Sequence, residues 1–479
     1  MDTGGEPSLS PSPEEAEECL AIFRTQMLRY LAFLHLPPDM SAQQLHAQRP
    51  FLFLCITTVT TKSTEKRQAF GHEVRQTIAR RMLIEDGQNI DIDIDLLLGL
   101  LVFLAWGNDQ LYNINRKILF RFTHFAMIMV FELRLNKPWP PKDTNMLSAV
   151  NVPAPATHTM EERRAVLACF LMSSCVSSFF AQTDAMRWTP YLDECLDLLG
   201  RSQEAPSDEI FAHQVRLQLF SHRVRQVMWP AGEGELADGP TVPPSFYLQT
   251  LQWKLGELKS AFSPRLQHDS KCSPGPPVVE RNHVTNDSNS LGILLASVYH
   301  SELSIHEVAL QKTPITVDGP GFRRLEALYK CLSTVKLALD NFFSLPLSEY
   351  PYVSFPYFAQ VCHSIVILFK LTTLDDPAWD TGLVRSTVDL GLVLDQFIHN
   401  LNQASATGED GSVNGIYAKT AKMFMSVKSW YAAKRVADPV QSDDSAFPMA
   451  DENSLLQEPM ILDDLDDVWL RDVLGSWTG

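Results

Sequence analysis

Apolar residues recur at three- and four-residue spacing along most of the chain, which is the pattern of helices with one buried face. The first such stretch begins at Pro13, carries apolar residues from Leu20 to Leu34, and is stopped by Pro37. Further helices are predicted at residues 42–62, 65–85, 93–107, 114–135, 160–181, 188–200, 207–228, 245–261, 290–311, 320–343, 354–374, 379–402 and 412–436. Sustained apolar–polar alternation and hairpin signals are missing from the sequence, so we predict an all-α fold.

The connecting segments are rich in proline, glycine and polar residues, above all residues 263–290. We expect a disordered insertion or a subdomain break there. No fixed repeat and no lasting heptad pattern indicates a solenoid or a coiled coil. The predicted organisation is a disordered N-terminus at 1–12, a multi-helical body of roughly a dozen or more helices at 13–437, and a tail at 438–479.

Charge is concentrated in that tail. The chain has 479 residues and a formal charge of −17, of which residues 438–479 carry −10 from eleven acidic residues and one basic residue. The tail is therefore expected to be mostly disordered, with an amphipathic helix near its end. The body is only mildly acidic and shows no obvious basic face, which disfavours direct nucleic-acid binding by this chain alone.

The eight cysteines are sparse and form no C-x-x-C pair, which indicates buried free thiols in a reduced compartment. The first residues lack the basic start and apolar core of a signal peptide. The most apolar run, Leu96 to Trp106, is too short for a membrane span, which takes about 20 residues. We expect a soluble intracellular protein without a membrane partner.

Catalytic motifs are missing: the sequence contains no G-x-S-x-G, Walker A, H-E-x-x-H or Rossmann glycine pattern. Cys362 and His363 are adjacent within a predicted helix and offer a nucleophile and a base. Packing in the core is the better interpretation, because cysteine is usually buried. We therefore predict no catalytic residue, no cofactor-binding residue and no metal ligand in this chain.

The aspartate cluster Asp463–Asp467 has the D-D-x-x-D form with which helical terpene synthases bind Mg²⁺ on a diphosphate. Those enzymes place this motif in the middle of the chain. Their second metal motif is begun by Asn286 and Asp287, but its glutamate position is occupied by Leu294. An enzyme of terpene-synthase type is thus kept only as an alternative.

The same tail segment has an apolar helical face interleaved with aspartates. The residues on this face are Leu462, Leu465, Trp469, Val473 and Trp477. Such a helix can bind in a partner's groove with its large side chains as anchors, as acidic transcriptional activation segments do. The alternative is that the last helix docks on its own body.

Five stretches of the sequence carry a common pattern: EERRAVLACFLMSS at 161–174, DAMRWTPYLDECL at 184–196, RPFL at 49–52, LLLGLLVFLAW at 96–106 and FELRLNKP at 131–138. Together they resemble the fungal-specific transcription factor domain, the middle homology region of fungal binuclear zinc cluster regulators. The resemblance covers residues 20–200 and continues as a family-like helical region to about 437.

Within these stretches we expect structural roles. Arg163, Arg164 and Arg187 are expected to pair with acids of neighbouring helices, and Trp188 with Pro190 to fix a helix junction. A third group should line the core. Its members are Met172, Cys175, Phe179 and Phe180.

The resemblance implies a nuclear transcription regulator, of a kind that often controls biosynthetic (secondary-metabolite) or catabolic gene clusters. The family's zinc cluster needs six cysteines near the N-terminus, whereas Cys19 is the only cysteine in the first 50 residues here. Either an upstream exon carries the cluster, or the protein acts through a DNA-binding partner and the transcription machinery. A metabolite-sensing helical scaffold with a small-molecule effector remains a further alternative.

Overall fold

The computed structural model describes residues 11–83, 92–107, 111, 116–138, 157–180, 183–202, 204–228, 244–262, 285–310, 321–406 and 416–437. This part of the chain contains sixteen α-helices, short 3₁₀ and π segments and no strand, which confirms the all-α prediction. The chain divides into two compact units, Met1–Ala421 and Lys422–Gly479. Residues 263–284 of the predicted insertion at 263–290 lie outside the described residues, as does the tail, whereas residues 285–290 are helical.

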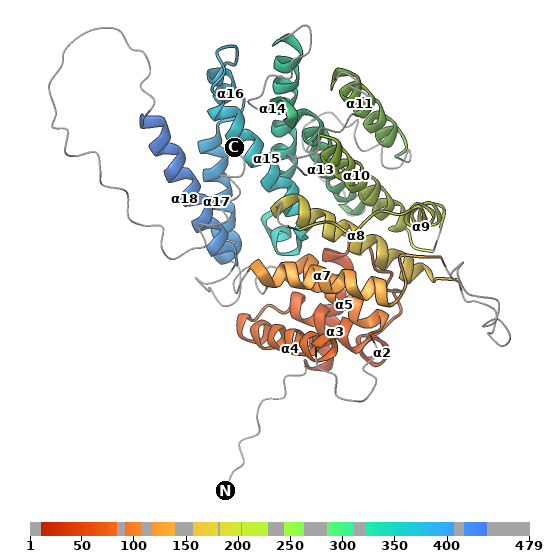
Figure 1. The fold of residues 1–479 in the computed structure, drawn as a ribbon. Helices are drawn as coiled ribbons and strands as arrows, with labels where there is room; N and C mark the ends of the chain where they lie inside the picture. The colour runs from red at the N-terminus through yellow and green to blue at the C-terminus, as the bar shows by residue number, and fades with distance from the viewer. Residues whose placement is uncertain are drawn as a thin grey trace, which may run out of the picture. The chain divides into compact units, whose positions relative to one another are not determined.

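The N-terminal helices pack around the pair formed by α3 and α5. They are α1 (Pro13–Ile22), the π segment η1 (Phe23–Met27), α2 (Ala42–Gln48), α3 (Pro50–Thr60), α4 (Thr64–Leu83), α5 (Ile94–Trp106) and α7 (Arg116–Glu132). In Figure 1, α3, α4, α5 and α7 lie side by side, in agreement with their contacts. Every residue of α5 from Asp95 to Trp106 is buried, so the apolar run of the sequence is a core helix that α3 and α7 cover.

The contact between α3 and α5 is unusually close. A Cβ atom on Gly99 would overlap the ring of Phe51, so only glycine lets the two helices approach this far. On the same side, the buried Asp95 carboxylate accepts hydrogen bonds of 2.9 Å from the backbone N–H groups of Phe51 and Leu52. Asp95 thereby satisfies the first free donors of α3, which Pro50 begins.

The middle of the chain forms α8 (Met160–Phe180), α9 (Pro190–Arg201) and α10 (Asp208–Met228). Buried Arg164 of α8 binds Asp208 through two hydrogen bonds of 2.7 and 2.9 Å, at the first residue of α10. The same guanidinium contacts Glu204 at 2.7 Å. This ion pair fixes the start of α10 on α8, because a bidentate pair specifies both distance and orientation.

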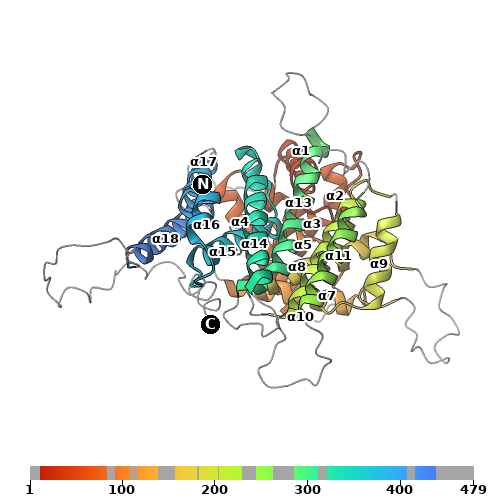
Figure 2. The ribbon, with the colours of Figure 1, turned by 90° about the horizontal axis from the view of Figure 1, so that it is seen from above.

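The remaining helices of the first unit are α11 (Pro244–Ser260), α13 (Thr285–His306), η4 (Glu307–Leu310), α14 (Gly321–Phe343), η5 (Leu347–Tyr352), α15 (Phe355–Thr373), α16 (Thr381–Thr387) and α17 (Leu390–Ala406). Helices α13, α14 and α15 pack against one another, and α10 and α11 cover α13 (Figure 2). Helices α11 and α13 contact each other directly, and α13 begins at Thr285, within the predicted break at 263–290.

Three predicted helix boundaries were wrong. The predicted helix 42–62 is split at Arg49, because Pro50 starts a new helix. The predicted helix 379–402 is split before Asp389, whose carboxylate accepts from the N–H of Leu392 and starts α17. The first helix ends in the π segment at Met27, since the following chain is held in the core without helical structure.

Two helices, α8 and α15, are long and apolar enough by composition to span a membrane. In both, however, 78% of the apolar window is buried inside the protein. Their apolar faces are thus accounted for by packing, as in core helices of a globular protein.

Helix α18 (Ile416–Ala437) crosses into the second unit. Between 422 and 437 this helix carries four basic residues and no acidic residue. Phe424, Val427 and Tyr431 are buried, while Met425 and Trp430 are each 42% exposed.

Candidate functional site

A line of polar side chains lies where α15 meets α13 and the η4 segment that follows it, and we call it the polar seam (Ser297, His300, Glu307, Gln360 and His363). Gln360 Nε2 donates to Ser297 Oγ at 3.2 Å, and the Nδ1 atoms of His300 and His363 are 3.1 Å apart. Both pairs have the same sequence separation of 63 residues, so α13 and α15 run parallel and in register. In the seam, the two helices are joined by polar side-chain contacts as well as by apolar packing.

The seam ends on a carboxylate. Nε2 of His363 lies 2.9 Å from Oε2 of Glu307, the residue that starts η4 directly after α13. The side chains of His363 and Glu307 are only 6% and 10% exposed. Glu307, His363 and His300 thus form a buried cluster, which we call the Glu–His–His cluster, that joins η4, α15 and α13.

Burial and charge shift the pKa of His300 in the same direction and the pKa of Glu307 in opposite directions. Burial lowers the pKa of His300 well below its usual value, and the neighbouring His363 and Arg225 lower it further. Burial by itself would raise the pKa of Glu307, but His363, Arg225 and Lys370 together bring this pKa below its usual value. Glu307 is therefore a carboxylate and His300 a neutral imidazole at neutral pH.

Helix α10 extends the polar surface toward the N-terminal helices. Gln214 Nε2 donates to the backbone oxygen of Tyr30 at 2.9 Å, and Gln218 Nε2 donates to Ser174 Oγ of α8 at 2.9 Å. One turn further on, the Oγ atoms of Ser221 and Ser301 are 2.9 Å apart. The spacing of 214, 218 and 221 places these side chains on one face of α10.

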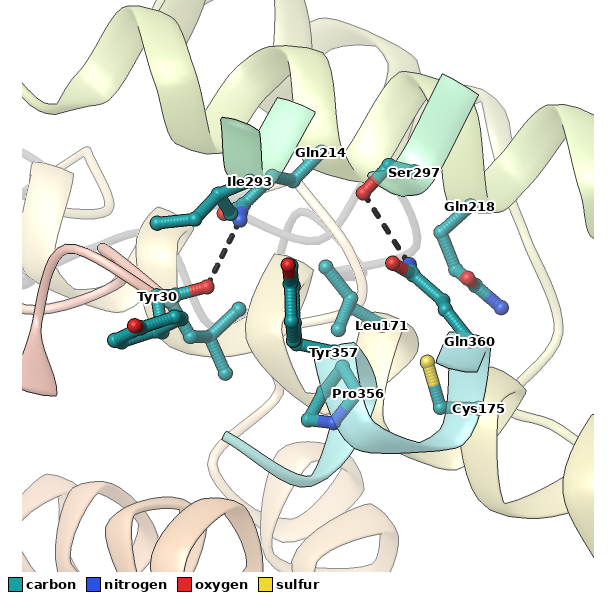
Figure 3. A pocket seen from close by; sticks show the side chains of 11 residues that line it. Tyr30, Leu171, Cys175, Gln214, Gln218, Ile293, Ser297, Pro356, Tyr357 and Gln360 are labelled. Atoms are coloured by element: carbon teal, nitrogen blue, oxygen red, sulfur yellow. Dashed lines mark hydrogen bonds between the residues drawn. The ribbon is translucent and has the colours of Figure 1, made fainter. Parts of the chain in front are cut away.

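A cavity of about 10 Å³ lies where these polar side chains meet (Figure 3). It is lined by Tyr30, Leu31, Leu171, Cys175, Gln214, Gln218, Ile293, Ser297, Pro356, Tyr357 and Gln360. A cavity of this volume has room for one water molecule. The side-chain Oε1 atoms of Gln214 and Gln360 are buried and have no protein partner, so both can accept a hydrogen bond from such a water.

The cavity lining is not a reactive centre. Burial raises the pKa of the Cys175 thiol to about 12 and raises the pKa of Tyr357 well above its usual value. Both groups therefore stay protonated at neutral pH, and neither offers a nucleophile or a base. No group of three histidine, cysteine, aspartate or glutamate side chains in the described part of the chain is arranged to hold a metal ion.

Cys362 and His363 are core residues, as the sequence indicated, but they do not act on each other. Burial raises the pKa of Cys362, and the two ring nitrogens of His363 face His300 and Glu307. The predicted tail residues lie outside the described residues. These are Leu462, Leu465, Trp469, Val473 and Trp477, with the aspartates 463–467 between them.

The resemblance motifs contain structural residues. Arg164 binds two acids as predicted. Trp188 donates to Asp193 at 2.8 Å and packs edge-on against Phe170, at the junction where Pro190 starts α9. Arg163 instead lies against Tyr191, with its guanidinium 6.0 Å from the ring centre.

Three of the four residues that we predicted to line the core are buried. Met172, Cys175 and Phe180 are buried, and Phe179 is half-buried. The seven described cysteines are buried free thiols, which confirms that prediction for all but Cys272.

Sequence reasoning missed most of the polar seam and the polar side chains of α10, α13 and α15 beside it. A usable signal was present: polar residues at three- and four-residue spacing inside apolar helices. They are Gln214, Gln218 and Ser221 on α10, Ser297, His300, Ser301 and Ser304 on α13, and Gln360, His363 and Ser364 on α15. The partner Glu307 lies beyond the end of its helix, and only the structure shows that it turns back toward His363.

Comparisons with known proteins place the chain among fungal regulators. It is 31% identical over 446 residues to "Transcription factor opdL" of Penicillium oxalicum (strain 114-2 / CGMCC 5302), covering 91% of this chain and 73% of that protein. It is 29% identical over 495 residues to a "Transcription factor" of Aspergillus terreus (strain NIH 2624 / FGSC A1156), covering 98% of this chain and 71% of that protein.

A more distant relative is "Transcriptional regulator WAR1" of Candida albicans (strain SC5314 / ATCC MYA-2876). It is 20% identical over 371 residues, covering 75% of this chain and 35% of that protein. The family model ATEG07667_C, described as a C-terminal domain, matches residues 347–479. No solved structure matches the chain.

Proposed function

The chain belongs to the family of fungal transcription factors that these relatives represent, and we propose that it is a nuclear regulator whose helical body works with an acidic activation segment at 438–479. The observation that carries this proposal is the similarity to a named transcription factor over 91% of the chain. The similarity extends through the helical body, so it is not a single shared motif.

The chain is not an enzyme by this comparison, since its relatives are named as transcription factors. The buried groups of the polar seam fit that conclusion. They bind one another across helices, and the cavity beside them has room for a water molecule only.

The activation segment is supported by its composition. Eleven of its residues are acidic, and five large apolar residues between 462 and 477 share one helical face. Alternating acids and large apolar residues keep such a segment soluble while its anchors bind a partner's groove. The family model that matches residues 347–479 includes this segment.

A reporter assay tests the segment. The full chain is fused to a heterologous DNA-binding domain, and transcription is compared with that of Trp469→Ala plus Trp477→Ala. We expect the double variant to lose most of its activation, because two of the five anchors are truncated.

The matched control is Val468→Ala plus Leu474→Ala, two apolar residues of the same segment that lie off the anchor face. This control should retain activation. Equal activity of the two double variants, or no activation by the fusion, would contradict the proposed activation segment.

We also propose that the regulated genes form a biosynthetic or catabolic cluster. DNA would be read by a zinc cluster encoded upstream of Met1 or by a partner protein. RNA sequencing of a strain without this gene is expected to show reduced transcripts confined to one set of neighbouring genes. Scattered changes across the genome would contradict the cluster proposal.

A further inference from the structure

The hydrogens of the Glu–His–His cluster can be counted from its geometry. Nε2 of His363 lies 2.9 Å from Oε2 of Glu307. An ionised carboxylate only accepts hydrogen bonds, so this ring nitrogen must carry a hydrogen. The proton count of the cluster is then decided by the contact between the two rings.

The two Nδ1 atoms face each other at 3.1 Å, with ring centres 4.8 Å apart. One hydrogen belongs between them, since two would collide and none would leave two acceptors facing each other. If His300 carries this hydrogen, both rings are neutral. If His363 carries it, His363 is an imidazolium beside Glu307, and neutral His300 has its own hydrogen on Nε2.

These two arrangements differ by one proton, and both keep the two hydrogen bonds. We propose that the Glu–His–His cluster is a binding site for a single proton, which rests on His363 against Glu307 while His300 changes tautomer. The proton enters at His300 Nε2, the hydrogen between the rings moves to His363, and no bond between α13, η4 and α15 is broken.

The surrounding groups favour one proton over two. Arg225 of α10 and Lys370 of α15 add positive charge near the cluster, and both lower the pKa of Glu307. Arg225 donates its hydrogen bond to the backbone oxygen of Ser178, so it acts on the cluster through its charge. A second proton would charge His300 between these cations and His363, and burial already disfavours that charge.

The other helices bring no further carboxylate into the cluster among the described contacts. Cys331 of α14 faces Glu307, and burial with that carboxylate raises the pKa of the thiol, which stays neutral. Glu302 of α13 lies 3.4 Å from Lys259 and 3.8 Å from Lys330, and it also acts on His306. Glu307 is therefore the counter-ion for the bound proton.

Proton binding changes how firmly η4 is held to α15. With the proton, the Glu307–His363 hydrogen bond joins two opposite charges. Without the proton, a neutral imidazole still donates to the Glu307 carboxylate, so the bond is kept but the attraction between opposite charges is lost. This inference concerns the helical body alone, and it stands whether or not the tail activates transcription.

Nitrogen NMR of the full chain labelled with ¹⁵N-histidine tests the proton count directly. His300→Asn and His363→Asn identify the two rings. As pH rises, we expect the cluster to lose one proton in a single step, in which His300 moves its hydrogen from Nε2 to Nδ1. Independent titration of the rings, or a His300 tautomer that does not change, would overturn the proposal.

A variant pair tests the counter-ion. Glu307→Gln removes the charge, and the midpoint of the protonation step should fall by about 1–3 pH units, as for loss of an adjacent opposite charge. Glu302→Gln, at the end of the preceding helix α13, should leave the midpoint unchanged. An unchanged midpoint in Glu307→Gln would overturn the role of Glu307. If Glu307→Gln does not fold, the titration of the unmodified chain still decides the proposal.

Discussion

The α3–α5 interface and the polar seam between α13 and α15 both bury ionisable side chains, but they use them differently. At α3–α5 the carboxylate of Asp95 binds two backbone N–H groups and completes one helix end. In the polar seam, side chains bind side chains: His300 contacts His363, and His363 contacts Glu307. The first arrangement fixes a helix and the second links two helices through groups that exchange protons.

The two regions also differ in how closely their helices approach. Gly99 of α5 lies so near the ring of Phe51 that no side chain fits between them. The polar seam instead borders a water-sized cavity with two unpartnered glutamine oxygens. A dense apolar contact resists rearrangement, whereas a polar contact beside a cavity has alternative hydrogen-bond partners. We infer that the N-terminal helices are the rigid part and the seam the adjustable part of the first unit.

Acidification should produce the largest difference in stability between the two regions. Burial lowers the pKa of His213 to about 4 and also lowers the pKa of His300 and of His306. Because these pKa values lie below those of the unfolded chain, their contribution to stability is present above pH ~6.5 and is lost as pH falls toward ~4. For His213 alone the loss is about 3 kcal/mol.

The pKa of Asp95 is shifted in the opposite direction, since burial raises it. Its contribution to stability is present below the unfolded pKa near ~4 and is lost as pH rises through the folded pKa. Hydrogen exchange corrected for intrinsic rates, compared at pH ~7 and pH ~4.5, should show α10 and α13 losing protection before α3 and α5. Equal loss in both regions would contradict the comparison.

Asp95→Ala should be the most damaging single substitution at the α3–α5 interface. It leaves the buried N–H groups of Phe51 and Leu52 without an acceptor, which costs about 2–5 kcal/mol of unfolding free energy. The matched control is Asp93→Ala, which removes a half-exposed cap of α5 that accepts from Leu96. Urea unfolding should show a loss of only about 1 kcal/mol for this control.

Gly99→Ala tests the close approach itself. The added methyl group collides with the ring of Phe51, and such overpacking costs about 1–3 kcal/mol. Gly256→Ala in α11 is the control, because a Cβ there meets no atom within 4 Å. The control should gain about 0.5–1 kcal/mol from its higher helix propensity. A gain at Gly99 in the same urea experiment would show that α3 can move away from α5.

Much of this comparison could be predicted from the sequence. The apolar run Leu96 to Trp106 and the fold class follow from composition and helical spacing, and both are confirmed. The cap by Asp95 could not be predicted, because it depends on which helix packs next to α5. Its partners Phe51 and Leu52 lie 44 and 43 residues away in the sequence.

The polar seam was harder to predict, because each of its residues has an ordinary local explanation. His363 follows Cys362 in an apolar helix, and Ser297 and His300 belong to another helix 63 residues earlier. Only the parallel register of α13 and α15 pairs them. The proposed activation segment at 438–479 is the reverse case: its sequence pattern carries the prediction, and it lies outside the described residues.

The smallest effect is expected at the weakest pair of the seam, Ser297 with Gln360. Ser297→Ala removes the acceptor of Gln360 Nε2 at 3.2 Å, on a side chain whose Oε1 already has no protein partner. A rigid site would lose about 1–3 kcal/mol for a newly unpaired buried donor. Because the cavity beside Gln360 has room for a water molecule, we expect that water to replace the hydroxyl and the loss to stay below about 1 kcal/mol. Gln360→Leu with Ser297→Ala, which removes both partners, should then be no less stable than Ser297→Ala alone. A loss well above that range in urea unfolding would show that the seam is as rigid as the α3–α5 interface.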